Sequence, residues 1–148
     1  MNADIELIPL IIADIYELAG RFRASGEAIA HAVGQTQARW QVMSAASAEP
    51  KTVPQIARRL GVTRQNVQRI ADLLVAEGSA AFTPNPDHRG SPFLVLSKRG
   101  HATLAALGKA AKARHAKLAR KLAEADVQTM HKSLRRLLAA LAHNDLTT

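Results

Sequence analysis

The segment Pro54-Gln-Ile-Ala-Arg-Arg-Leu-Gly-Val-Thr-Arg-Gln-Asn-Val-Gln-Arg-Ile70 carries the start and stop signals of two short helices joined by a tight turn. Thr52 and Gln55 have the spacing of a capping box, and Pro54 is tolerated in a first helical turn, where its missing N–H would have no partner. Gly61 ends the first helix because glycine readily adopts the left-handed conformation. Thr63 is a suitable N-cap for the second helix. The spacing predicts a helix-turn-helix.

The second of these helices separates into an apolar and a polar face at 100° per residue. Its apolar stripe consists of Val67, Ile70, Ala71 and Leu74. The polar face carries no Glu or Lys before Asp72, so it differs from an ordinary solvated helix. Arg forms paired hydrogen bonds with guanine, Gln and Asn do so with adenine, and a helix fits the major groove of B-DNA. We therefore expect the polar face of this helix, together with its N-cap, to contact DNA bases. The residues are Thr63, Arg64, Gln65, Asn66, Gln68 and Arg69.

The composition favours an anionic partner and excludes several kinds of chemistry. The net charge is +8, which favours nucleic acid ahead of a membrane surface. There is no cysteine, so disulfides, thiolate chemistry and Cys-type zinc sites are excluded. The apolar runs are too short or too interrupted to span a bilayer, and acids stand near the N-terminus where a signal peptide has bases. We expect a soluble cytoplasmic protein without a membrane partner.

The N-terminal part of the chain predicts two helices ahead of the helix-turn-helix. Residues from about 4 to 31 form one amphipathic helix, which must stop by Gly34. Its apolar positions are wider than one neighbouring helix would cover, which indicates a subunit interface; they are Ile5, Leu7, Ile8, Leu10, Ile11, Ile12, Ile15, Leu18 and Phe22. Thr36 caps a second helix, from Gln37 to about Ala48, with Val42, Met43 and Ala46 facing inward and the only tryptophan at position 40.

A β-hairpin is predicted directly after the helix-turn-helix. Two short strands, 80–83 and 93–96, are separated by the proline-containing segment 84–92, which makes a long and stiffened tip. A hairpin in this position is a wing. We expect its tip to contact DNA through Asp87, His88 and Arg89.

Two further helices are predicted in the C-terminal part. Ser97 caps a helix of roughly 25 residues whose apolar stripe is Leu104, Leu107, Ala111, Leu118 and Leu122. Its other face is basic, and we favour a solvated face over contact with the DNA backbone; the residues are Lys109, Lys112, Arg114, Lys117, Arg120 and Lys121. The last helix has its apolar stripe at Val127, Met130, Leu134, Leu138 and Leu141. A two-fold dimer would bury the long apolar faces at both ends of the chain.

The order of these elements resembles the MarR family of bacterial winged helix-turn-helix transcription regulators. The resemblance is carried by residues 36–43, by residues 55–70, by Asp87-His-Arg-Gly90 and by Leu96-Ser-Lys-Arg-Gly100, and it covers essentially the whole chain. It implies one mainly α domain over residues 1–148, with a small β-hairpin wing. The winged helix-turn-helix lobe would occupy about 36–100, and dimerisation helices would occupy about 4–31 and 101–146.

The resemblance also implies a mode of action. Family members are homodimers whose recognition helices enter successive major grooves of a pseudo-palindromic operator, while wing arginines enter the flanking minor grooves. Many are repressors that small aromatic anions release from double-stranded DNA, so a ligand-released repressor is expected here. The effector pocket would lie between the dimer helices and the DNA-binding lobe, where Arg21, Arg39 and Trp40 could meet an aromatic anion.

Other classes of function are less consistent with the sequence. The chain has six histidines but no phosphate loop, no paired carboxylates and no His-x-x-x-His pair, so we expect no catalytic residues, no cofactor and no metal site. Two alternatives stay open. The basic charge would equally serve a sequence-tolerant architectural DNA-binding protein, and the protein would be a metal-responsive regulator if histidines such as His31 and His115 converged with an acid.

Overall fold

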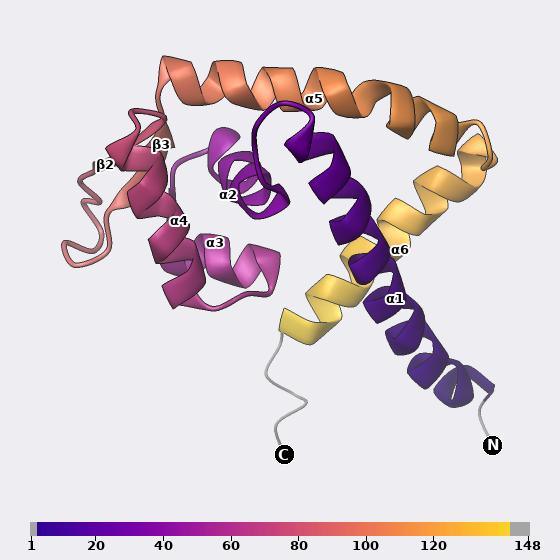
Figure 1. Cartoon of the computed structure of the whole chain (residues 1–148). Helices are drawn as coiled ribbons and strands as arrows, with labels where there is room; N and C mark the ends of the chain where they lie inside the picture. Colours follow the sequence, from indigo (N-terminus) through magenta and orange to yellow (C-terminus); the bar gives the residue numbers. More distant parts are fainter. Residues whose placement is uncertain (1–2, 143–148) are drawn as a thin grey trace. The chain divides into compact units, whose positions relative to one another are not determined.

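The computed structural model describes residues 3–142 and contains six helices and three short strands in that range (Figure 1). The elements are α1 (Ala3–His31), α2 (Gln37–Ser47), β1 (Lys51–Thr52), α3 (Val53–Leu60), α4 (Arg64–Ala76), β2 (Ala80–Thr83), β3 (Phe93–Leu96), α5 (Lys98–Ala119) and α6 (Glu124–Ala142). The chain divides into two compact units, residues 1–111 and 112–148, and α5 begins in the first and ends in the second. The predicted fold class, mainly α with a β-hairpin, is confirmed.

The helix-turn-helix forms where the sequence predicts it. The Thr52 side chain accepts a hydrogen bond from the Gln55 N–H, and the Gln55 side chain accepts one from the Thr52 N–H, which completes the capping box of α3. Gly61 ends α3 with a φ of 66°, in the left-handed region. The Thr63 hydroxyl accepts a hydrogen bond from the Asn66 N–H at 3.2 Å and starts α4. These local signals fix both ends of the turn.

The hairpin strands also agree with the prediction, but the sheet has a third strand. β2 and β3 are antiparallel, with Ala80 opposite Leu96 and Thr83 opposite Phe93. β1 pairs with the other edge of β3 through Lys51 and Thr52, so the strand order is β1-β3-β2. The sequence analysis treated Lys51 as part of a connection because two residues are too few to show an alternating pattern.

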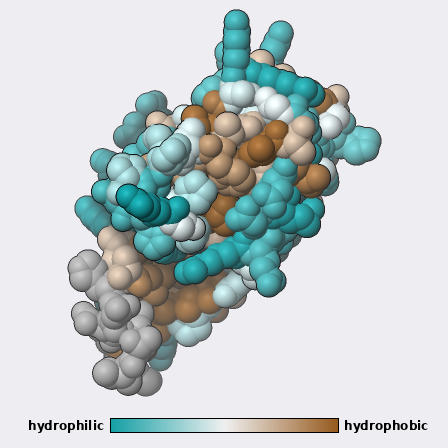
Figure 2. All heavy atoms as spheres, turned by 90° about the vertical axis from the view of Figure 1, so that its left-hand side faces the viewer, coloured by the Kyte–Doolittle hydropathy of each residue, from teal (hydrophilic) through white to brown (hydrophobic). Residues whose placement is uncertain are grey.

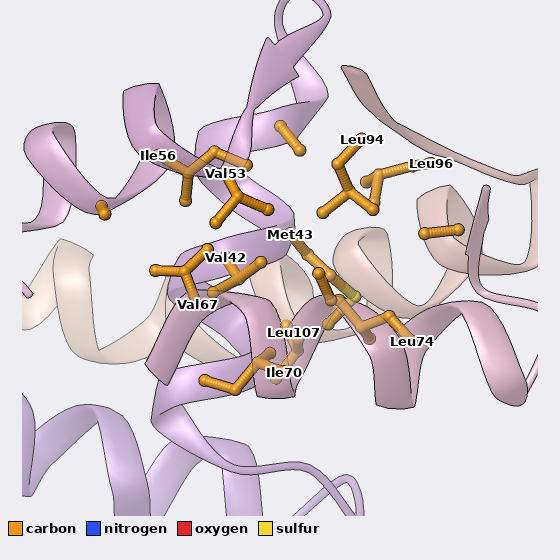
Figure 3. Close-up of a cluster of buried hydrophobic side chains, with 14 of the residues drawn as sticks. Val42, Met43, Val53, Ile56, Val67, Ile70, Leu74, Leu94, Leu96 and Leu107 are labelled. Carbon is orange, nitrogen blue, oxygen red and sulfur yellow. The ribbon is translucent and has the colours of Figure 1, made fainter. Parts of the chain in front are cut away.

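A single hydrophobic core joins the helices and the sheet of the first unit. The predicted inward residues of α2 and α4 are all buried in it, and side chains from α3, β3 and α5 point toward them (Figure 3). The largest fully buried side chains are Met43, Ile56, Leu74, Leu94, Leu107, Val42 and Val67. Because α4 contributes an entire face to this core, its opposite face is held toward solvent.

The helix α1 is anchored to this core only at its C-terminal end. Gly26, Ile29 and Ala30 are buried, and the Glu27 carboxylate accepts a hydrogen bond from the N–H of Gln37, the first residue of α2, at 3.0 Å. Ile15 is half-buried, and most of the other large apolar residues of α1 are exposed, which agrees with a face wider than one chain covers; the exposed ones are Ile5, Leu7, Ile8, Leu10, Ile11, Ile12, Tyr16, Leu18 and Phe22.

The second unit holds the end of α5 and the whole of α6. The prediction that α5 continues to Leu122 is wrong, because Lys121 and Leu122 donate to carbonyls three residues earlier and α5 ends at Ala119. Acidic Glu124 and Asp126 then favour a new helix N-terminus. α6 has no buried residue, and its whole predicted apolar stripe is exposed: Val127, Met130, Leu134, Leu138 and Leu141. Within residues 3–142, no helix is long and apolar enough to cross a membrane.

Candidate nucleic-acid interface

The exposed face of α4 is formed by the polar residues that the sequence analysis selected. Arg64, Gln65, Gln68 and Arg69 are exposed, and Asn66 is half-buried. Thr63 is also exposed, but its hydroxyl already serves as the cap of α4. These residues lie together because the buried stripe of α4 fixes the rotation of the helix about its axis.

Two hydrogen bonds along α4 orient this face in the absence of DNA. The Arg69 guanidinium donates from Nη2 to Asn66 Oδ1 at 3.1 Å. The Gln68 amide donates from Nε2 to Asp72 Oδ1 at 2.9 Å. Each bond pairs a candidate base-reading side chain with another residue of the same helix. Asn66 can therefore aim Arg69, whereas base contact by Gln68 would compete with Asp72.

The wing tip is an ordered loop centred on Asn85, which is only 9% exposed. Its side chain donates to the Ser91 carbonyl and accepts from the Asp87 N–H, both at 3.1 Å. The predicted contact residues Asp87, His88 and Arg89 are all exposed. The sequence analysis did not select Asn85, although an Asn side chain that bonds to the backbone two residues on is a known turn signal.

A cleft of about 350 Å³ lies between α4 and the wing. Its apolar lining comes from Val53, Pro54, Phe82 and Pro92, and its polar lining comes from Arg64, Gln65, Gln68, Gly90 and Ser91. Figure 2 looks onto the side of the molecule that carries these elements and shows mainly hydrophilic side chains around a smaller apolar patch. The predicted helix and wing surfaces are therefore adjacent, with hydrogen-bonding groups beside apolar ones, as DNA base edges and thymine methyl groups require.

The base of the wing is joined to α5 by unusually close packing. The Ser97 N–H donates to the Ser79 carbonyl at 3.0 Å, and the Ser97 hydroxyl donates to the Gly78 carbonyl at 2.6 Å. Gly100 lies so near that a Cβ atom on it would be 2.0 Å from the Ser79 carbonyl oxygen. Ser97 also caps α5, as predicted, by accepting from the Gly100 N–H at 3.2 Å. Only glycine fits at position 100.

A charged cluster centred on Glu77 connects the end of α4 with α2 and α5. The Glu77 carboxylate forms an ion pair with Arg39 and accepts a hydrogen bond from the Ser79 hydroxyl at 3.0 Å, while its backbone carbonyl accepts one from Arg99 at 2.7 Å. Burial alone would raise the pKa of Glu77, but the hydrogen bonds from Arg39 and Ser79 and the charges of Arg39 and Arg99 outweigh it, so its pKa is lowered. The sequence analysis missed this cluster, whose members are far apart in the chain.

The three residues predicted for an effector pocket have protein partners in the structure. Arg39 binds Glu77 and also donates to the Gln35 side chain at 3.1 Å. Arg21 forms an ion pair with Glu17 at 2.8 Å on an exposed part of α1. Trp40 is half-buried against the core. Among residues 3–142, no group of three or more His, Asp or Glu side chains could hold a metal ion.

Comparison with known proteins finds a family match for part of the chain. Residues 34–89 match the model of the MarR family. An uncharacterized protein of Mycobacterium tuberculosis is 49% identical over 134 residues, which is 90% of this chain and 94% of that protein. The transcriptional activatory protein BadR of Rhodopseudomonas palustris is 28% identical over 103 residues, covering 67% of this chain and 59% of BadR.

Solved structures share the fold. The regulator BldR of Sulfolobus solfataricus has a TM-score of 0.79 at 15% identity, covering 95% of this chain and 99% of BldR. A mutant of E. coli MarR complexed with operator DNA has a TM-score of 0.67 at 20% identity, covering 93% and 99%. A MarR family protein of M. tuberculosis complexed with p-aminosalicylic acid has a TM-score of 0.66 at 20% identity, covering 83% and 94%. Residues 34–89 thus match the MarR family, whose members are transcription regulators and not enzymes, and the described residues share the fold of solved MarR regulators.

Proposed function

We propose that the protein is a homodimeric, cytoplasmic regulator that binds a pseudo-palindromic operator, with α4 in the major groove and the wing in the adjacent minor groove. The observation that carries this proposal is the face of Gln65, Gln68 and Arg69, which is exposed on a helix whose other face is fully buried. The cleft between α4 and the wing makes the two surfaces continuous. The complex of E. coli MarR with operator DNA supports the same use of the fold.

Exposed apolar side chains support the homodimer. α1 and α6 each carry a long row of them, and α6 buries none of its residues within one chain. Burying each such side chain contributes about 1.5–3 kcal/mol, so leaving both rows in water would be unfavourable. Sedimentation at micromolar concentration should give the mass of a dimer. A folded monomer with unchanged helicity would contradict the proposal.

We propose repression that an aromatic carboxylate relieves. Support comes from the family and from the p-aminosalicylic acid complex of a relative in fold. A ligand carboxylate that binds Arg39 would have to replace the Glu77 carboxylate, and this exchange would loosen the connection between α4, α2 and the wing base. Salicylate should therefore weaken operator binding. Release requires weaker affinity for the DNA-bound dimer, so equal affinities for free and DNA-bound dimer in calorimetry would contradict it.

The decisive experiment is footprinting on the DNA that flanks the gene for this protein. A protected pseudo-palindrome should appear, with half-sites about one helical turn apart. Whether the protein represses or activates is then measured with a reporter gene whose promoter carries that site, either upstream of the promoter or overlapping it. BadR is named as an activatory protein. If the intact site raises transcription of the reporter, the protein is an activator and the proposal of repression fails, while the proposal of operator binding is unaffected.

A sequence-tolerant architectural DNA-binding protein is the second candidate, favoured by the net charge of +8. Binding to phosphates alone is strongly salt-dependent and discriminates little between sequences. Titrating the footprinted duplex and a scrambled duplex at several salt concentrations separates the two candidates. Equal affinities at every salt concentration would favour the architectural protein.

A further inference from the structure

The whole net charge of the protein originates in one segment. Of the 20 Lys and Arg residues, eight lie in residues 98–123, which contain none of the 12 Asp and Glu residues. The rest of the chain is therefore balanced, with 12 basic and 12 acidic residues, and this segment accounts for the net charge of +8.

The density is highest at the end of α5, in the second unit. We call residues 112–121, which are the last turns of α5 up to Ala119 and the two residues that follow, the cationic end of α5; its basic residues are Lys112, Arg114, Lys117, Arg120 and Lys121. All five are exposed. None of the salt bridges in the described part of the chain includes Lys112, Lys117, Arg120 or Lys121. The positive charge of these four side chains is therefore presented to solvent without an acidic partner among residues 3–142.

Such an arrangement is unfavourable in the isolated protein. Arg114 and Lys117 are three residues apart on α5, so like charges are neighbours along the helix and destabilise it. Surfaces that serve only for solubility carry interspersed charges of both signs. A bound polyanion would remove the repulsion. The helical part of the cationic end, residues 112–119, extends for about 12 Å at 1.5 Å per residue, a length over which duplex DNA presents about seven phosphates.

The sequence analysis favoured a solvated face for these residues. From the density of positive charge and the absence of acidic residues in 98–123, we now propose that the cationic end of α5 binds the phosphate backbone of double-stranded DNA, as a contact separate from α4 and the wing. Leu118 is the only large apolar residue among residues 112–121, whereas a helix that lies on a membrane needs a broad apolar face. Contact with phosphates needs none. A second copy of the same segment would be repelled. The inference rests on the proposed function only for the choice of DNA as the polyanion.

The test uses the full-length protein with the α4 surface disabled by Arg64→Ala, Gln65→Ala and Arg69→Ala. In this background a neutral variant adds Lys112→Gln, Lys117→Gln, Arg120→Gln and Lys121→Gln. A charge-preserving control adds Lys112→Arg, Lys117→Arg and Lys121→Arg. Arg114 stays unchanged because it interacts within the protein. Gln and Arg are both good helix formers, and circular dichroism with sedimentation checks that all variants keep the same helicity and mass.

Binding of a scrambled duplex is then measured over a range of salt concentrations. The background protein and the charge-preserving control should bind equally, and the neutral variant should bind more weakly at low salt. The plot of log affinity against log salt should become shallower by about 0.9 for each phosphate that the neutral variant no longer neutralises. An unchanged slope overturns the proposal, and so does charge-dependent binding to phosphatidylserine vesicles without binding to DNA. If the protein with the α4 substitutions still prefers the operator to the scrambled duplex, the proposed role of α4 fails, while the salt dependence caused by the cationic end of α5 is unaffected.

Discussion

Replacing Gly100 by alanine should destabilise the protein, whereas the same replacement at Gly108, the other glycine of α5, should not. The new Cβ at position 100 would lie 2.0 Å from the Ser79 carbonyl oxygen, 3.1 Å from the Ser79 carbonyl carbon and 3.3 Å from the Leu96 Cβ. Both close contacts at Ser79 are with backbone, so no side-chain rotation can relieve them. The start of α5 must therefore move away from the wing base by roughly 1 Å to reach ordinary contact distances.

That movement also removes a hydrogen bond. The Ser79 carbonyl accepts from the Ser97 N–H at 3.0 Å, and Ser79 is only 2% exposed, so water cannot easily replace the donor. Overpacking contributes about 1–3 kcal/mol and an unsatisfied buried group about 1–3 kcal/mol. A total near 4 kcal/mol corresponds to a decrease in Tm of roughly 10 °C for a chain of this length.

Gly108→Ala is the matched control on the same helix. A Cβ at Gly108 would meet nothing within 4 Å, and alanine is favoured over glycine inside a helix by about 1 kcal/mol. Thermal unfolding followed by circular dichroism, at one fixed protein concentration, should show a lower Tm for Gly100→Ala and an unchanged or higher Tm for Gly108→Ala. Equal melting temperatures for Gly100→Ala and the unaltered protein would refute the close packing of α5 on the wing base.

Three further predictions test the DNA-binding lobe. Arg69→Ala should lose about 1–3 kcal/mol more binding free energy for the operator than for a scrambled duplex. Arg89→Ala should weaken binding to the two duplexes alike and lower the slope of log affinity against log salt by about 0.9. If titrations show the reverse pattern, Arg89 is the residue that reads the sequence and Arg69 the one that contacts phosphate. Glu77→Gln should lower stability by about 1–3 kcal/mol near neutral pH, because the ion pair with Arg39 is removed. Because the pKa of Glu77 is lowered in the folded protein, its carboxylate stabilises the fold above the ordinary pKa of 4.5, and this stabilisation disappears as pH falls through the lowered pKa. The free energies of unfolding of Glu77→Gln and of the unaltered protein, measured with denaturant, should therefore converge in acid. Thr63→Ala removes the cap of α4 and should cost about 1 kcal/mol, with Thr63→Ser close to the unaltered protein by the same measurement.

The parts of the fold that the sequence predicted are those set by neighbouring residues. Capping residues and Gly61 specify α3 and α4 within a few positions, and the change from helical to alternating periodicity marks the hairpin. β1 was missed because its two residues become a strand only by pairing with β3, some 40 residues away. The end of α5 was placed too late because the apolar spacing continues to Leu122 beyond the point where the helix stops.

The candidate site divides in the same way. Periodicity alone placed Gln65, Gln68 and Arg69 on the exposed face of α4, and the structure confirms their exposure; their contact with DNA stays a prediction. The pairing of Arg39 with Glu77 joins residues 38 positions apart and could not be inferred from spacing. The assignment of Arg39 to an effector pocket also stays a prediction, with Glu77 now identified as the competitor for its guanidinium. The extent of the domain over residues 1–148 likewise stays a prediction.

Asn85 should allow the neighbouring residues of the wing tip to be substituted without loss of the fold. Because its side chain and backbone already supply the hydrogen bonds that close the loop, the exposed residues 86–90 carry little responsibility for the fold. Substitutions there should accumulate without loss of expression, while those at Asn85 should be purged. Duplicated copies of such a regulator could therefore change their general affinity for DNA by exchanging the tip alone, with α4 and its operator preference inherited unaltered.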